Sequence, residues 1–184
     1  MNNMQLKDFY LPEIYNTDKG KEHDYINAYY KNEFQHREQE IRLLEIGIYK
    51  GASTQLFRNW FTNAECWAIE NNGEGGGTFE IPNVTILWKD GYSDDALSHF
   101  ENNYFDYIID DGPHTLQSQK DAIIKWLPKI KSGGKLIIED IQKIEHILEL
   151  ENVIDKEIAS EWKTFDMRNN KGRYDDIIFE VTKK

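Results

Sequence analysis

Residues 41–61, IRLLEIGIYKGASTQLFRNWF, decide the fold class of this chain. The first residues form a short apolar run typical of a buried strand, and Gly47 and Gly51 then flank a turn. The residues after the turn place an apolar stripe on one face of a helix: Leu56, Phe57, Trp60 and Phe61. A strand that leads through a glycine turn into an amphipathic helix predicts the first unit of an α/β fold.

The same alternation continues along the chain. Further strands are expected at CWAIE, VTILW, FDYIID and KLIIE, with a loop at NNGEGGGTFEIPN. Helices are expected at residues 94–100 and at about 115–130, the second of them burying Ala122, Ile123, Trp126 and Leu127. A third helix should follow, with these residues facing inward: Ile144, Ile147, Leu148, Ile154 and Ile158. The alternation predicts a mostly parallel sheet with helices on both faces.

The two ends of the chain depart from this alternation. EWKTFDMR and YDDIIFEVTKK are strand patterns joined by NNKGR, which is typical of a polar hairpin turn, so the last of seven strands should be antiparallel. Before residue 41, one amphipathic helix is expected from Tyr25, Ile26, Tyr29, Tyr30 and Phe34. The prediction is a single domain, made of an N-terminal helical segment (1–40) and an α/β part (41–184).

Composition excludes several classes of function. The formal net charge is −11, from 33 acidic against 22 basic residues, which argues against a nucleic-acid partner. No run approaches the ~20 apolar residues of a membrane span, and no basic-then-apolar leader opens the chain. The single cysteine, Cys66, is expected in the core. We therefore expect a cytoplasmic protein without a membrane partner, and a homo-oligomer is left open.

Acidic residues follow the predicted strands at the points where ligands bind to open parallel sheets. Glu70 ends the second strand, Asp90 follows the third, and Asp110 and Asp111 end the fourth. Glu70 is placed to accept hydrogen bonds from ribose hydroxyls, next to the glycine turn. An ordinary strand–helix turn would equally explain the two glycines.

The fourth and fifth strands predict a metal site. If these strands are neighbours, Asp111 meets Glu139 and Asp140, and three close carboxylates need a cation or shared protons. An all-oxygen set suits Mg²⁺, and His114 beside it would be a general base. The alternative is that these acids cap the following helices and face solvent.

Several motifs together resemble a known family. NTDKGKEHDYINAYY, LLEIGIYKGAS, IIDDGPH, SGGKLIIEDI and DMRNNKGRYDDIIF are similar to class I S-adenosylmethionine-dependent methyltransferases. More narrowly, they resemble the metal-dependent sugar O-methyltransferases of natural-product pathways, of the mycinamicin type. The resemblance implies a Rossmann-like fold, S-adenosylmethionine and Mg²⁺ as cofactors, and a hydroxyl group of a sugar, glycan or related small molecule as the acceptor.

The resemblance also implies roles for individual residues. The expected Mg²⁺ ligands are Asp111, Glu139 and Asp140, and His114 is the expected base. Expected around the cofactor are Glu45, Gly47 and Gly51 at the methionine part, Glu70 at the ribose, and Asp90 and Asp110 nearby. Expected in an N-terminal lid are Thr17, Asp18, Lys19, His23 and Tyr25.

Three competing interpretations keep part of this picture. The chain could be a cofactor-binding module without activity, a catechol-type O-methyltransferase, or a glycosyltransferase that holds a nucleotide-sugar metal with an acid pair. The last leaves Glu70 and the glycine turn without a role.

Overall fold

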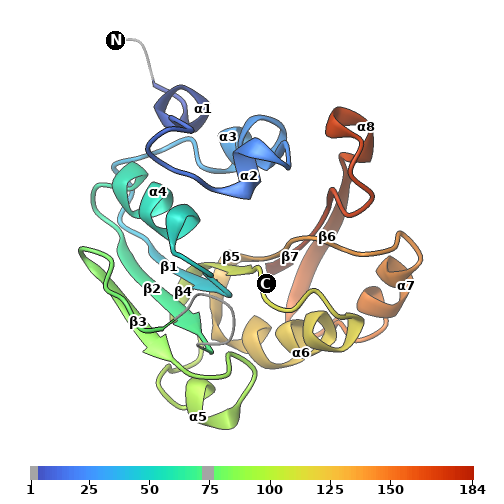
Figure 1. Ribbon diagram of the computed structural model, residues 1–184. Helices are drawn as coiled ribbons and strands as arrows, with labels where there is room; N and C mark the ends of the chain where they lie inside the picture. Colours follow the sequence, from blue (N-terminus) through green and yellow to red (C-terminus); the bar gives the residue numbers. More distant parts are fainter. Residues whose placement is uncertain (1–3, 72–76) are drawn as a thin grey trace.

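The computed structural model describes residues 4–71 and 77–184, and a single seven-stranded sheet runs through it (Figure 1). Across the sheet the strand order is β3-β2-β1-β4-β5-β7-β6. The strands are β1 (Arg42–Ile46), β2 (Glu65–Glu70), β3 (Val84–Trp88), β4 (Phe105–Asp110), β5 (Ile130–Ile138), β6 (Ala159–Asp166) and β7 (Ile177–Lys183).

The direction of the strands confirms the predicted fold class. Strands β1 to β5 pair in parallel, whereas β7 lies between β5 and β6 and is antiparallel to both. The chain builds outward from β1 to β3 and then returns to place β4 on the other side of β1. The strand order therefore reverses between β1 and β4, which is where open α/β sheets bind ligands.

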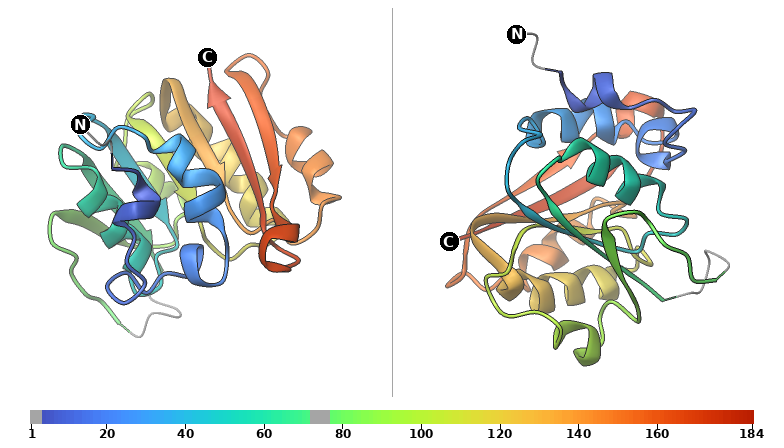
Figure 2. Two further views of the ribbon diagram at one scale, coloured as in Figure 1. Left: turned by 90° about the horizontal axis from the view of Figure 1, so that it is seen from above. Right: turned by 90° about the vertical axis from the view of Figure 1, so that its left-hand side faces the viewer.

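Helices cover both faces of the sheet (Figures 1 and 2). On one side lie the N-terminal helices and α4, and on the other lie α5 and α6. The helices are α1 (Leu6–Phe9), α2 (Asp18–Lys21), α3 (Lys31–Glu33), α4 (Ala52–Trp60), α5 (Asp94–Leu97), α6 (Leu116–Trp126), α7 (His146–Glu151) and α8 (Arg168–Lys171). None of the helices described by the structure is long and apolar enough to cross a membrane.

Successive residues of a strand point to opposite faces of the sheet and therefore pack into different hydrophobic cores. Leu43 packs with α4 and the N-terminal segment, and Leu44 packs with α6. The predicted stripe of α4 is fully in the first core, and the predicted stripe of α6 is in the second. Cys66 is buried with a free thiol, as expected, and burial raises its pKa to about 12.

Helix α6 and the following strand differ in length from the prediction. Thr115 caps α6 through its side chain, and the helix ends at Trp126 instead of continuing to residue 130. The sequence then forms a 3-10 turn at Leu127–Lys129, because Pro128 lacks the N–H that a longer helix needs. Strand β5 consequently begins at Ile130, five residues earlier than the apolar run indicated.

The predicted inward face of the third helix was partly wrong. Helix α7 spans only His146–Glu151, and Leu150 is its buried residue. Leu148 is 65% exposed and Ile144 is also exposed, whereas Ile154 is buried. Because α7 covers only six residues, the apolar residues before and after it do not lie on one continuous helical face.

Two further connections differ from the expected elements. Between β6 and β7 the predicted hairpin turn contains helix α8, which Gly172 caps at its C-terminal end with φ of +77°. Of the predicted loop at residues 71–83, residues 72–76 lie outside the described part, and residues 77–83 form neither helix nor strand. The helix expected near residue 97 is α5, a single turn that Ser93 caps.

The N-terminal segment packs directly on the sheet. Its predicted amphipathic helix consists of a π-helical turn at Ile26–Tyr30 followed by α3. The five residues predicted on its apolar stripe are all buried, and they share one core with α4 and with Ile109 and Ile137 of the sheet. The segment therefore belongs to the same hydrophobic core as strands β1, β4 and β5.

Candidate functional site

The register of the strands brings the predicted site residues to one edge. Ile46 pairs with Ile69 and with Asp110, and Asp110 pairs with Ile138. The next residues of β1, β2, β4 and β5 therefore form a row at the carboxyl edge: Gly47, Glu70, Asp111 and Glu139. This is the edge that the sequence predicted.

Both glycines of the first turn have left-handed backbones. Gly47 has φ of +78° and Gly51 has φ of +76°. A Cβ on Gly47 would overlap the backbone of Asp111, and one on Gly51 would overlap the side chain of Ile81. Close packing against β4 and against residue 81 thus requires both glycines, so packing alone is a sufficient reason for them.

Glu70 is buried and holds the glycine turn. One of its carboxylate oxygens accepts from the backbone N–H groups of Ile48 and Tyr49, each at 2.9 Å, and the other accepts from Asn71 N at 2.9 Å. These bonds fix the turn against the end of β2. The predicted contact of Glu70 with a ribose stays a prediction.

Asp90 and Asp110 occupy different environments. Asp90 is exposed and accepts from the backbone N–H of Tyr92 at 2.9 Å, as in an ordinary turn. Asp110 is buried and accepts a hydrogen bond from the hydroxyl of Tyr92. Burial raises the pKa of Asp110 to about 7, and the Tyr92 bond offsets only part of that rise.

A buried lysine lies among the acids of the site. Nζ of Lys19 is 2.5 Å from Asp111 Oδ2, contacts Glu139 Oε2, and is 3.5 Å from Glu45 Oε1. Burial alone would lower the pKa of Lys19, but the three carboxylates outweigh it and hold that pKa well above its ordinary value. The cation that neutralises these strand ends is therefore supplied by the N-terminal segment.

Two of these carboxylates have further partners. Glu45 accepts from Ser53 Oγ at 2.7 Å and from Thr54 Oγ1. Glu139 accepts from the hydroxyl of Tyr30 at 2.8 Å. Both carboxylate oxygens of Glu139 are therefore bonded to the N-terminal segment.

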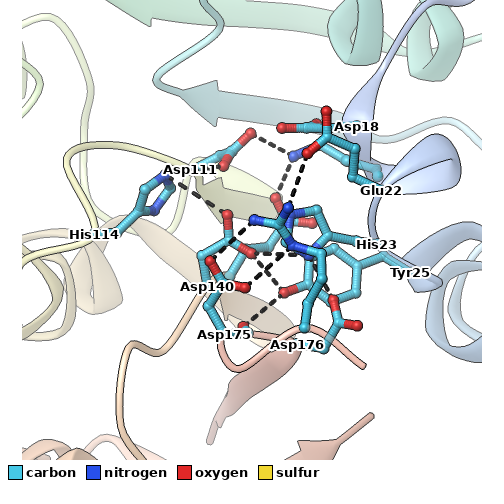
Figure 3. A network of polar contacts seen from close by, with 12 residues as sticks. Asp18, Glu22, His23, Tyr25, Asp111, His114, Asp140, Asp175 and Asp176 are labelled. Atoms are coloured by element: carbon cyan, nitrogen blue, oxygen red, sulfur yellow. Dashed lines mark hydrogen bonds and ion pairs between the residues drawn. The ribbon is translucent and has the colours of Figure 1, made fainter. Parts of the chain in front are cut away.

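Asp111, Asp140 and His114 form a group that can hold a metal ion (Figure 3). One ligand atom from each lies within 4.8 Å of the others. His114 Nε2 is 3.8 Å from Asp111 Oδ1 and 3.6 Å from Asp140 Oδ2. Two carboxylates and an imidazole are a fitting donor set for a divalent cation.

The backbone at this group is strained. His114 and Asp140 both have φ of +54°, in the left-handed region that residues with a side chain seldom adopt. Such strain persists only where the surroundings fix it, and it is common at functional sites. The carbonyl of Asp140 accepts from Gln119 Nε2 at 3.3 Å and from Gln142 Nε2 at 3.1 Å, which fixes the turn.

Asp18, His23 and Tyr25 of the predicted lid lie beside the same group (Figure 3). His23 is buried, with Nδ1 2.5 Å from Asp176 Oδ1 and 3.6 Å from Asp140 Oδ1. Thr17 is buried and caps α2 by accepting from Lys19 N at 3.3 Å. His23 thus contacts the acidic edge, whereas Thr17 holds the turn that carries Lys19, and the contact of both with the cofactor stays a prediction.

A pocket of about 580 Å³ opens next to Asp140 and His114. Its lining was mostly missed by the sequence reasoning and includes Leu116, Gln142, His146, Arg173, Tyr174 and Asp175. The motif DMRNNKGRYDDIIF had indicated that residues 166–179 matter, but no pattern within it assigned a role to Arg173 or Tyr174. This size is within the range of small-molecule sites.

The β6–β7 connection fastens the N-terminal segment to this pocket. Lys171 Nζ donates to the carbonyls of Gly20, Lys21 and His23, at 2.6, 3.1 and 3.0 Å. Arg173 Nη1 lies 2.9 Å from Glu22 Oε2. The turn that carries Lys19 and His23 is therefore held from the opposite end of the chain.

Comparison with known proteins gives curated relatives of one kind. The chain is 25% identical to demethylmacrocin O-methyltransferase of Streptomyces fradiae, over 71% of this chain and 35% of that protein. It is 30% identical to 8-demethyl-8-(2-methoxy-alpha-L-rhamnosyl)-tetracenomycin-C 3'-O-methyltransferase of Streptomyces olivaceus, over 57% of this chain and 29% of that protein. The chain therefore spans about a third of the length of these relatives.

Among solved structures, the fold is similar to that of MycE methyltransferase from the mycinamycin biosynthetic pathway, solved in complex with Mg, SAH and mycinamycin VI. The TM-score is 0.73 at 17% identity, over 99% of this chain and 55% of that one. The fibrillarin pre-rRNA processing protein of Methanococcus jannaschii has a TM-score of 0.60 at 14% identity, over 79% of this chain and 67% of that one. At these identities the likeness concerns the fold alone.

The model of one protein family matches residues 44–141, which is more than half of the chain. The matched segment runs from β1 through the glycine turn to Asp111, His114 and Asp140, so it includes the carboxyl edge described above. This chain belongs to the methyltransferase domain family.

Proposed function

We propose that this chain is an S-adenosylmethionine-dependent O-methyltransferase that uses a divalent cation, expected to be Mg²⁺, and acts on a hydroxyl group of a sugar, glycan or sugar-bearing small molecule. Both curated relatives are named O-methyltransferases, and MycE was solved with Mg and SAH. Because the chain is shorter than these relatives, the activity and the acceptor are both part of the proposal.

One observation carries the proposal. Asp111 and Asp140 each direct one oxygen toward His114, at 3.8 and 3.6 Å, next to the pocket of about 580 Å³. Two acids and an imidazole thus meet beside a space for an acceptor, at the carboxyl edge of the sheet and close to the point where the strand order reverses between β1 and β4. A module that only binds a cofactor has no need for this group.

Asp111 and Asp140 would hold the cation in this proposal. The predicted third ligand, Glu139, accepts from Tyr30 and contacts Lys19, so its role as a ligand stays a prediction. A bound divalent cation would orient an acceptor hydroxyl and lower its pKa.

His114 is the proposed base. Burial lowers the pKa of His114, and this effect outweighs the nearby carboxylates, so the imidazole is neutral at neutral pH. A neutral imidazole can accept the proton of an acceptor hydroxyl as the oxygen takes the methyl group. S-adenosylmethionine would supply that group as a sulfonium methyl.

The cofactor is proposed to lie along the remaining part of the carboxyl edge. Glu45, Gly47 and Gly51 would border its methionine part, Glu70 its ribose, and Asp90 and Asp110 its nucleoside side. The turn that Glu70 fixes leads into the N-terminal end of α4, and such helix ends favour anionic groups.

The charge of the pocket favours a neutral acceptor. Asp18, Asp140 and Asp175 line it, and Arg173 there is already paired with Asp175 and Glu22. A phosphate-bearing acceptor would therefore meet more negative than positive charge. Two adjacent hydroxyls of a sugar suit the open positions of a cation held by two carboxylates.

A panel of acceptors tests the proposal. Simple sugars, glycans, sugar-bearing natural products, catechols and RNA are each incubated with S-adenosylmethionine and Mg²⁺, and release of S-adenosylhomocysteine is measured. Turnover of a sugar-bearing acceptor, lost on chelation and in Asp140→Asn but kept in the exposed Asp166→Asn, is expected. Turnover confined to catechols or RNA, or full activity after exhaustive chelation, would contradict it.

Binding separates the remaining alternatives. A methyltransferase should be stabilised thermally by S-adenosylhomocysteine, whereas a glycosyltransferase should respond to a uridine diphosphate sugar. Binding of S-adenosylhomocysteine without turnover of any acceptor, including the sugars, would leave the non-catalytic module.

A further inference from the structure

Three tyrosines of the N-terminal segment each donate a hydrogen bond to a different buried carboxylate. Tyr25 donates to Asp140 Oδ1 at 2.6 Å, Tyr30 donates to Glu139 Oε1 at 2.8 Å, and Tyr29 donates to Glu180. Their rings lie in the core, as their helical spacing indicated. The hydroxyl groups, in contrast, reach carboxylates more than a hundred residues away, two of them just after β5 and one within β7.

Tyr25 fixes one oxygen of Asp140 and leaves the other facing the site. Asp140 Oδ1 accepts from Tyr25, and Oδ2 faces His114 Nε2 at 3.6 Å (Figure 3). The Tyr25 hydroxyl also donates to the carbonyl of Asp175 at 3.2 Å, and its ring stacks on His23 at 4.8 Å between centroids. Burial, together with Asp140, raises the pKa of Tyr25, so the hydroxyl stays a donor.

Lys19 likewise holds one oxygen of Asp111 and leaves the other facing His114. Asp111 Oδ2 is 2.5 Å from Lys19 Nζ, and Oδ1 faces His114 Nε2 at 3.8 Å. Each carboxylate of the proposed metal site therefore has one oxygen held by the N-terminal segment and one oxygen turned toward His114.

We propose that Tyr25 and Lys19 are positioning residues of this metal site, so that the N-terminal segment sets the affinity for the cation. The inference rests on the proposed function, because it assumes that Asp111 and Asp140 bind a divalent cation. Groups that hold the outer oxygen of a ligating carboxylate orient it, and removing such a group typically weakens metal binding 10–100-fold.

Binding of Mn²⁺ to the full chain, measured by calorimetry and by electron paramagnetic resonance without methyl donor or acceptor, tests this inference. Tyr25→Phe removes only the hydroxyl and is expected to weaken Mn²⁺ binding about 10–100-fold. Tyr29→Phe is the matched control, because it removes an equally buried hydroxyl whose partner, Glu180, lies outside the site. Its Mn²⁺ affinity should equal that of the unchanged protein.

The outcomes separate the inference from the proposed function. An unchanged Mn²⁺ affinity in Tyr25→Phe, or an equal loss in Tyr29→Phe, would overturn only the role of Tyr25. Absence of Mn²⁺ binding to the unchanged protein would overturn the metal site itself.

A second measurement needs no variant. If the N-terminal segment holds the ligands, bound Mn²⁺ must in turn stabilise that segment, since coupling is reciprocal. Amide hydrogen exchange of residues 19–30 in the unchanged protein is expected to slow when Mn²⁺ is added. Exchange there that Mn²⁺ leaves unaltered, while the metal binds, would overturn the inference.

Discussion

Replacing Lys19 by methionine removes the cation that two buried carboxylates, Glu45 and Glu139, share with the partly exposed Asp111. The Lys19 side chain is 1% exposed, and it contacts Asp111, Glu139 and Glu45. Taking one partner from a buried ion pair typically costs about 3–5 kcal/mol, because the remaining charge stays buried without compensation. For a chain of this size, each kcal/mol lowers Tm by about 2–4 °C, so a decrease of roughly 6–20 °C is expected.

The loss of stability in Lys19→Met should depend on pH. Burial raises the pKa of Glu139 to about 8, and Lys19 opposes that rise. An acid with a raised pKa in the folded state contributes stability below its ordinary pKa and loses it as the pH rises through the raised value. Without Lys19 the pKa of Glu139 should rise further, so Lys19→Met should cost more at pH 8 than at pH 6.

Urea unfolding followed by circular dichroism, with chelator present, measures this effect. Lys163→Met is the control, because Lys163 is 50% exposed and contacts only Glu161 among the ion pairs of the described residues. It should change the free energy of unfolding by no more than about 0.5 kcal/mol. A loss below about 1 kcal/mol in Lys19→Met, with the slope against urea unchanged, would refute the reasoning that Lys19 neutralises the acids.

Three further predictions concern the other groups of the site. Glu70→Ala should weaken S-adenosylhomocysteine binding by about 1.5–3 kcal/mol in calorimetry, since hydrogen bonds to a charged group are lost. An unchanged dissociation constant in a folded variant would show that Glu70 is not part of the cofactor site. His114→Ala should lower turnover by about 10²–10⁴-fold while cofactor still binds. The activity of the unchanged protein should rise with pH through the pKa of His114, which burial lowers from its ordinary value. Wild-type turnover in the variant would place the base elsewhere. The pKa of Asp110 is raised to about 7 by burial, so its contribution to stability is present below 3.8 and is lost as the pH rises through 7. In Asp110→Asn, the free energy of unfolding in urea should therefore fall less steeply as the pH rises from 3.8 to 7. The same slope against pH as in the unchanged protein would contradict the raised pKa of Asp110.

The sequence predicted the row of acids because strand ends need only local patterns. The second, fourth and fifth apolar runs end at the acids Glu70, Asp110–Asp111 and Glu139–Asp140, and parallel strands must bring those ends to one edge. Asp111 and Asp140 therefore met as expected, and His114 lies beside them. The strand count, the antiparallel last strand and both buried helical stripes followed from the same periodicities.

The partners of those acids could not be predicted in this way. Nothing in NTDKGK distinguishes Lys19, which is buried, from Lys21, which is exposed, because the difference arises from contacts 92 and 120 residues away. The tyrosine stripe indicated the core correctly, but periodicity places a ring and is silent about its hydroxyl. The phase of α7 and the helix α8 depend on packing between segments, which one sequence does not contain.

The hydrogen bonds from Lys171 to the carbonyls of Gly20, Lys21 and His23 have a consequence for how the chain folds as it is synthesised. The N-terminal turn leaves the ribosome before the residues between Glu139 and Asp176 that hold it. Contacts that close such long loops form slowly, since their entropy cost precedes any gain. We therefore expect residues 15–34 to stay unprotected on the nascent chain until β7 has emerged, with five buried aromatic rings exposed until then.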